Sequence, residues 1–244
     1  MSSRPCPGRR SFAPSLALTV FMFLLAAAFA ALGRWQWRLG DAQEAQFLRF
    51  RLGAARVIPL GGAALSRVPP YQRVSLRGRY DGAHQFLLDN SIQDGRDGYQ
   101  VLTALRRPHG DTVLVDRGWV PFTGSRAHLP DVSLRSAGPM TVTGRVGRLP
   151  VAGLSIGHAP PSAGGRWPKV TSFPSIGELA LALGEPLDRH ILLLDPGEPD
   201  GYVRDWRAPG MPALRNWGYA IQWWAFAAAA LVLWVVLSLK RRPR

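Results

Sequence analysis

Two long runs of uncharged, mostly apolar residues lie near the two ends of the sequence. Residues 11–33 and 217–239 each contain twenty-three residues without Asp, Glu, Lys or Arg. A helix of that length spans about 35 Å, enough to cross a hydrocarbon core of about 30 Å with some tilt. We therefore predict two transmembrane helices, one at each end of the chain.

The charges around these runs predict how the two helices are oriented. Basic residues flank the ends of the runs that are nearest the chain termini, namely Arg4, Arg9 and Arg10 before the first run and Lys240, Arg241, Arg242 and Arg244 after the second. Such charges favour the cytoplasmic side of a membrane. We therefore expect cytoplasmic tails at 1–10 and 240–244 and an outer domain at 34–216. The short tail before the first run does not resemble an organelle transit peptide, which favours a bacterial inner membrane with a periplasmic outer domain.

The first run has a second interpretation, a secretory signal peptide cleaved near the small residues Ala28 to Ala31. The apolar run, however, exceeds the usual h-region of about 7–15 residues. Trp35 and Trp37 also follow the run where an interfacial aromatic belt is expected. Both observations favour a retained membrane anchor.

Between the runs, alternating positions predict β-strands. In residues 73–80 the buried-type positions Val74, Leu76, Gly78 and Tyr80 alternate with polar ones, the pattern of a half-buried strand. A two-residue turn at Gly82 and Ala83 would lead to the next strand. Further strands are expected at 84–90, 99–107, 112–121, 138–150 and 189–195. The four strands from 73–80 to 112–121 are joined by short connections, which favours antiparallel pairing.

Helical patterns are short in the outer segment. Residues 41–56 are rich in helix formers, and residues 173–183 form a second helical stretch followed by Gly184, a typical helix C-cap. The predicted fold class is membrane α+β. Two transmembrane helices flank a mainly antiparallel β domain of 183 residues that carries one or two short helices.

Charge and cysteine content exclude several classes of protein. The formal net charge is +14, and seven of these charges lie in the two tails, which contain no acids. The tails would contact anionic lipid of the bilayer, whereas the remainder lacks the clustered basic stripe of a nucleic-acid-binding protein. The only cysteine, Cys6, lies in the predicted cytoplasmic tail. A copper-thiolate chaperone or thiol oxidoreductase, which needs paired cysteines, is thereby excluded.

The sequence VDRGWVP invites a catalytic interpretation, but no accompanying motif supports one. No nucleophile elbow, P-loop or HExxH sequence is present, and Lys169 has no convincing serine signature beside it for a serine-lysine peptidase. We expect Arg117 to pair with a carboxylate, Trp119 to pack in the core and Gly118 to allow another backbone to come close. We therefore expect no catalytic residues and no enzyme activity.

The histidines do not predict a metal site. They are scattered through the outer segment without an i, i+4 or HxH pair: His84, His109, His128, His158 and His190. Such spacing is unlike that of protein zinc sites. We expect no bound metal.

An ordered set of motifs resembles the Surfeit-locus family of cytochrome c oxidase assembly proteins. The motifs are WQ after the first run, LRGRYD, LLDN, GYQVLTALRRPHGDTVLVDRGWVP, ELALALGEPLDRHILLLDP and GYAIQWW. The resemblance covers about residues 32–226. It implies a terminal helix at each end, an outer loop domain and a role in maturation of the haem-copper subunit. It also implies subunit I of the oxidase and haem a synthase as partners, and haem a as a possible cofactor.

One position departs from the family pattern. Family members carry a histidine, the candidate haem ligand, three residues before the Tyr-Ala of the last helix, and Asn216 occupies that position here. Asparagine is not a usual axial ligand of haem. The resemblance therefore does not by itself assign haem coordination to this chain.

The outer ends of the two predicted helices form the candidate docking site. Its residues are Trp35, Gln36, Asn216, Tyr219, Gln222 and Trp223. In one interpretation the aromatic rings form an interfacial belt and Gln222 hydrogen-bonds to the first helix. In the other, the same rim binds a haem macrocycle or a helix of the oxidase. The sequence leaves both open.

We expect a non-catalytic assembly factor for a haem-copper oxidase, supporting haem a insertion or maturation of subunit I. Two alternatives stay open at this point. One is a carrier that delivers haem a directly, and the other is a membrane-anchored interaction scaffold unrelated to respiration.

Overall fold

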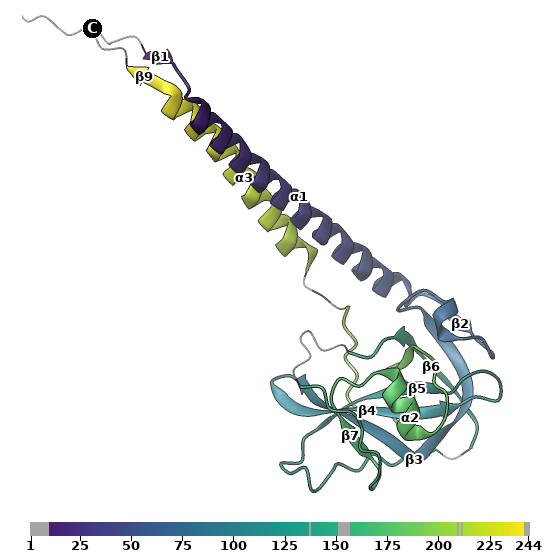
Figure 1. Cartoon of the computed structure of the whole chain (residues 1–244). Helices are drawn as coiled ribbons and strands as arrows, with labels where there is room; N and C mark the ends of the chain where they lie inside the picture. Colours follow the sequence, from purple (N-terminus) through teal and green to yellow (C-terminus); the bar gives the residue numbers. More distant parts are fainter. Residues whose placement is uncertain (1–9, 137, 151–156, 209, 211, 242–244) are drawn as a thin grey trace, which may run out of the picture. The chain divides into compact units, whose positions relative to one another are not determined.

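The computed structural model describes residues 10–136, 138–150, 157–208, 210 and 212–241. The chain divides into a helical unit, Met1–Phe47 with Pro209–Arg244, and a sheet unit, Leu48–Ala208. Figure 1 shows the two long terminal helices and the strands of the sheet unit. The predicted fold class, two apolar terminal helices around a mostly β domain, is confirmed.

The helical unit is an antiparallel pair formed by α1 (Leu16–Leu52) and α3 (Ala213–Ser238). Both helices are long and apolar enough to cross a membrane, which indicates a membrane protein. Residues 41–52 of the helical stretch expected at 41–56 are the last part of α1, which runs without a break for 37 residues and ends at Leu52, so residues 53–56 are not helical. At the far ends of the pair, β1 (Arg10–Phe12) and β9 (Leu239–Arg241) form a short antiparallel ladder.

Small residues at seven-residue spacing allow the two helices to approach closely. Ala26, Gly33 and Gly40 are buried on α1. A Cβ at Gly33 would lie 2.4 Å from Nε1 of Trp224, and one at Gly40 would lie 2.5 Å from the Trp217 ring. Each glycine therefore makes room for an indole ring against the backbone of the opposite helix. Packing of this kind replaces the hydrophobic effect as the driving force in a bilayer.

The sheet unit contains a closed barrel of five strands. Its order is β3 (Arg73–Gln93), β4 (Arg96–Arg106), β5 (Val113–Pro121), β8 (Ile191–Leu194) and β6 (Met140–Gly147), and β6 pairs back onto β3. All of these pairs are antiparallel except β5–β8. The connection between β5 and β8 is long and contains α2 (Ile176–Leu183), which permits a parallel crossover.

Two short strands lie beside β3. Both β2 (Val57–Pro59) and β7 (Lys169–Thr171) pair with it in parallel, and a turn of 3₁₀ helix, η1 (Leu65–Arg67), follows β2. Residues 150 and 157 border a segment, 151–156, that lies outside the described residues.

The prediction of a turn at Gly82 and Ala83 is wrong, because β3 continues through these two residues to Gln93. The ladder with β4 shifts register between Tyr80 and Gln85 instead of reversing. The buried Asp81 carboxylate accepts a hydrogen bond from the Ala83 amide at 3.1 Å and forms an ion pair with Arg106 at 2.8 Å. These side-chain contacts replace the ladder hydrogen bonds lost at the irregularity, so the strand bends without ending.

Helix α2 has the caps that its sequence specifies. Ser175 and Glu178 form a reciprocal capping box at its start, and Gly184 adopts a left-handed conformation, with φ of 77°, at its end. The prediction of a Gly184 C-cap is confirmed. The helix buries Leu179 against Phe86, Leu102 and Leu114 of the barrel, and it thereby covers one face of the sheet.

The packing of the helix pair gives a testable prediction. We expect Gly33→Ala to lower the stability of the pair by about 1–3 kcal/mol, because the added methyl group would displace the Trp224 indole. Gly218→Ala on α3 is the matched control, since its Cβ would meet no heavy atom within 4 Å and alanine favours a helix. Heating the full chain in detergent while following tryptophan fluorescence measures both. Equal midpoints for the two variants would contradict the packing described.

Candidate functional site

The structure places the six residues of the predicted docking site on two different faces of the helix pair. Asn216 is buried, at 3% exposure, on the same face of α3 as Ala213 and Ala220. Gln36 of α1 is half-buried, and its Oε1 atom is enclosed without a hydrogen-bond partner among the described residues. Both amides therefore belong to the inner, packed side of the pair.

The other four residues lie on or near the outer side. Trp35 and Tyr219 are 57% and 47% exposed, and Gln222 is also exposed. Trp223 is half-buried and stacks on Phe29 of α1, with 5.7 Å between ring centroids. Of the six residues, Trp35 on α1 and Tyr219 and Gln222 on α3 are therefore exposed, whereas Trp223 is partly covered by Phe29.

The hydrogen bonds between α1 and α3 do not include the one from Gln222 to the first helix that the sequence suggested. Within the described residues, Gln222 makes no hydrogen bond to α1. Instead, the indole N–H of Trp217 donates to Asp41 at 3.2 Å, and that of Trp234 donates to Thr19 at 3.0 Å. Tryptophan indoles, rather than the glutamine, connect the pair near its two ends.

The helix pair does not fit a haem iron at the family's ligand position. Asn216 offers an amide, which is not a usual axial ligand, and it is enclosed in the helix packing. All five histidines belong to the sheet unit, outside α1 and α3. Neither helix therefore supplies a histidine ligand for a haem iron.

In the motif VDRGWVP, Arg117 is a structural centre of the barrel. The residue is 1% exposed, and its guanidinium donates to oxygens from four separate segments: Gln85 Oε1 at 2.7 Å, Thr103 Oγ1 at 3.3 Å, Val132 O at 2.9 Å and Asp200 O at 2.7 Å. The carboxylate partner expected for Arg117 is wrong, since no described carboxylate lies within 4.0 Å of it. Neutral oxygens at fixed positions satisfy the cation instead.

The neighbours of Arg117 behave as their sequence predicted. Gly118 has φ of 107°, and a Cβ there would lie 2.6 Å from the carbonyl oxygen of Val203. Trp119 is 7% exposed, and its indole N–H donates to Ser91 O at 3.0 Å. The expected close approach of another backbone at Gly118 and the core position of Trp119 are both confirmed.

Lys169 and the histidines occupy structural positions. Lys169 is buried, and its Nζ donates to the carbonyl oxygen of Ser162 at 2.7 Å. His84 hydrogen-bonds to Asp81 at 2.7 Å, and His158 contacts Glu178 at 3.0 Å. Within the described ranges no three His, Cys, Asp or Glu residues lie close enough together to hold a metal ion.

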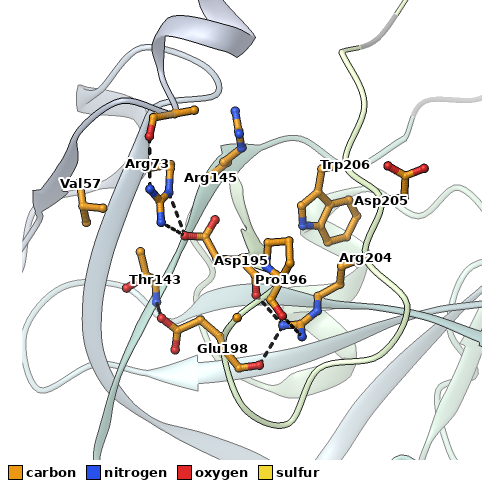
Figure 2. Close-up of a pocket in the computed structure, with 12 residues that line it drawn as sticks. Val57, Arg73, Thr143, Arg145, Asp195, Pro196, Glu198, Arg204, Asp205 and Trp206 are labelled. Carbon is orange, nitrogen blue, oxygen red and sulfur yellow. Dashed lines mark hydrogen bonds and ion pairs between the residues drawn. The ribbon is translucent and has the colours of Figure 1, made fainter.

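A polar cavity of about 620 Å³ lies in the sheet unit. Its lining includes Ala54 and Val57, which follow α1, and Asp205 and Trp206, which precede α3. Figure 2 shows three arginines around it, Arg73, Arg145 and Arg204, together with the acids Asp195 and Glu198. The cavity therefore combines several ionic groups at the place where the chain enters and leaves the barrel.

The sequence did not identify this cavity. Arg73 is one of several polar residues that alternate with apolar ones in residues 73–80, and Arg145 is one of two arginines in residues 138–150. Only the register of β3 on β6, in which Arg73 and Arg145 are directly opposite, brings them together. Each of the two strands contributes one arginine, so the sequence could indicate this cluster only if the pairing of the two strands were already known.

The buried acid beside Arg117 gives a prediction of pH dependence. Burial raises the pKa of the Asp116 carboxyl to about 7, although hydrogen bonds from the Gly118 amide and from Gln100 oppose the shift. In the unfolded chain this carboxyl titrates near pH 3.9. Between about pH 4 and 7, unfolding therefore releases a proton, and the free energy of unfolding falls as the pH rises.

We expect Asp116→Asn to remove that contribution. Because one pKa unit corresponds to about 1.4 kcal/mol, the variant should gain roughly 3–4 kcal/mol relative to the original chain between pH 4 and 7.5. Denaturant unfolding of the full chain in detergent at several pH values measures the difference. The exposed Asp111→Asn serves as the control, and a parallel pH profile for Asp116→Asn and the original chain would refute the assignment.

Comparison with known proteins finds a family whose sequence model matches most of the chain. The sequence model of the SURF1 family matches residues 23–228, which includes most of both terminal helices and the whole barrel. No curated protein matches the chain.

Proposed function

Because the chain belongs to the SURF1 family, which is linked to cytochrome oxidase assembly, we propose that it is a non-catalytic assembly factor for a haem-copper oxidase. In this proposal it supports haem a insertion or the maturation of subunit I. The observation that carries the proposal is the extent of the family match, which covers most of both helices and the whole barrel.

The proposed location is the inner membrane of a bacterium. In this arrangement residues 11–33 and 217–239 span the bilayer, the tails at 1–10 and 240–244 are cytoplasmic, and 34–216 is periplasmic. The basic tails and the two apolar helices support it.

We propose that the exposed residues Trp35, Tyr219 and Gln222, with Trp223, contact subunit I or haem a synthase. Aromatic side chains are common at protein interfaces, and an exposed glutamine near a helix end can hydrogen-bond across to a neighbouring helix. Gln36 and Asn216 would act indirectly, by fixing how α1 and α3 pack. Direct delivery of haem a is not favoured, because Asn216 replaces the family's histidine.

Deletion of the gene tests the proposed function. We expect membranes from the deleted strain to lose most of their haem a absorbance and oxidase activity, because in this proposal subunit I does not mature without the chain. Re-expression of the chain should restore both. Normal haem a spectra without the protein, in a strain that holds no second copy, would refute the role in oxidase assembly.

A double variant tests the docking surface. We expect Tyr219→Leu with Gln222→Leu to leave the protein inserted and abundant while reducing its co-purification with subunit I or haem a synthase about fivefold, since interface aromatics contribute about 1 kcal/mol or more. The control is Val232→Leu with Val236→Leu, which changes two exposed apolar positions of α3 elsewhere. Equal capture of partners by both double variants would exclude this surface.

A further inference from the structure

The polar cavity of the sheet unit contains acids that are already occupied. Asp195 accepts a charge-assisted pair of hydrogen bonds from Arg73, from Nε at 2.9 Å and from Nη2 at 2.5 Å. Glu198 accepts a hydrogen bond from the Thr143 amide at 3.1 Å. Asp205 is paired with Arg207. The carboxylates are therefore held by the protein's own donors, and the cavity presents no group of free acids to a cation.

Arg145 differs from the other charged residues in this cavity. Its Nη1 atom donates to Phe50 O in the last turn of α1 at 2.6 Å, and its guanidinium lies 4.2 Å from the centre of the Phe50 ring. Among the described residues it has no carboxylate within 4.0 Å, and Nε and Nη2 make no hydrogen bond. Figure 2 shows its guanidinium beside that of Arg73, without an interaction to the acids drawn there.

Two further features make this place favourable for a negative charge. Arg73 and Arg145 are direct cross-strand partners, so two cations stand opposite each other where like charges repel. Burial lowers the pKa of Arg145, the nearby Asp195 carboxylate opposes that shift, and Arg73 adds to it. An anion at the free edge of Arg145 would offset the cost of burying this cation.

We propose that this cavity binds the phosphate group of a small molecule or lipid, with the free edge of Arg145 as the principal donor. A planar guanidinium presents two parallel N–H groups that match two phosphate oxygens. Arg73 on the opposite strand is already paired with Asp195, so Arg145 is the cation that remains for the ligand. The cavity volume of about 620 Å³ is enough for a phosphate with an organic substituent.

Trp206 provides a place for the rest of such a ligand. Its indole N–H is fixed to Leu194 O at 2.7 Å, and the ring lines the cavity between Arg145 and Arg204. Arg204 itself donates to backbone oxygens of Asp195, Pro196 and Glu198 at 2.6–3.0 Å, so it shapes the wall. The inference concerns the barrel alone and does not depend on the proposed role in oxidase assembly.

Calorimetric titration of the full chain in detergent tests the proposal at constant ionic strength. The probes are inorganic phosphate, glycerol 3-phosphate and dihexanoyl phosphatidylglycerol below its micelle concentration. Binding of the first two identifies a soluble phosphate as the ligand. Binding of the lipid alone identifies a headgroup. Failure of all three to bind below about 10 mM would overturn the proposal.

Two pairs of variants locate the binding. Gly197 lines the cavity, and a Cβ there meets no heavy atom within 4 Å, so Gly197→Asp adds a negative charge without removing any contact. We expect it to weaken phosphate binding at least about tenfold, whereas Gly197→Asn, of the same size and neutral, should bind nearly as the original chain does.

The second pair removes an arginine. Arg145→Gln should weaken phosphate binding at least about tenfold, and Arg77→Gln, at an exposed position of β3 outside the cavity, should leave it unchanged. Because Arg145 also contacts α1, the Gly197 pair decides the result if Arg145→Gln does not fold. Equal affinity of Gly197→Asp and Gly197→Asn would place the phosphate elsewhere and overturn the assignment.

Discussion

The barrel depends on hydrogen bonding to one buried cation. Removing an arginine from water is costly, and the cost is tolerated only if its donors are satisfied. At Arg117 the acceptors come from β3, β4, the segment near Val132 and the return segment near Asp200. These segments are far apart in sequence, so the guanidinium is satisfied only when all of them are in place. The same residue that would destabilise an incomplete barrel therefore joins the finished one.

A second constraint acts in the helical unit, where lipid rather than water is the expected surroundings. Apolar side chains gain little there by contacting one another, so association requires close packing and a few polar contacts. Gly33 and Gly40 supply the space, Trp224 and Trp217 fill it, and an indole hydrogen bond to Asp41 adds a polar contact. The outward residues of the proposed docking surface depend on this packing, because it decides which side of α3 faces away from α1.

Local signals predicted the parts of the fold that depend on local physics. The uncharged runs predicted both long helices, and the residues around α2 predicted the Gly184 cap, because hydrophobic length and capping are properties of short segments. The closure of the barrel, the parallel β5–β8 pair and the continuation of β3 past Gly82 depend on contacts between distant strands. No periodicity within one segment contains that information.

The candidate site likewise has features that the local sequence predicts and features that depend on contacts between distant segments. Tyr219 and Gln222 lie three residues apart on α3 and are both exposed, but spacing alone cannot say whether their face meets α1 or the surroundings. Asn216 and Gln36 turned out to lie on the packed side, and Arg117 found neutral oxygens where a carboxylate was expected. The Arg73 and Arg145 neighbourhood required the strand register and was not foreseen at all.

The cavity lined by Ala54 and Trp206 also shows that the two ends of the barrel's own chain lie close together. A domain with adjacent ends can be inserted into another protein, or excised from it, without breaking its internal connections. The barrel is thus a domain inserted in the connection between the two helices of a hairpin. A circularly permuted version with new ends in a surface turn is a feasible form of the same domain.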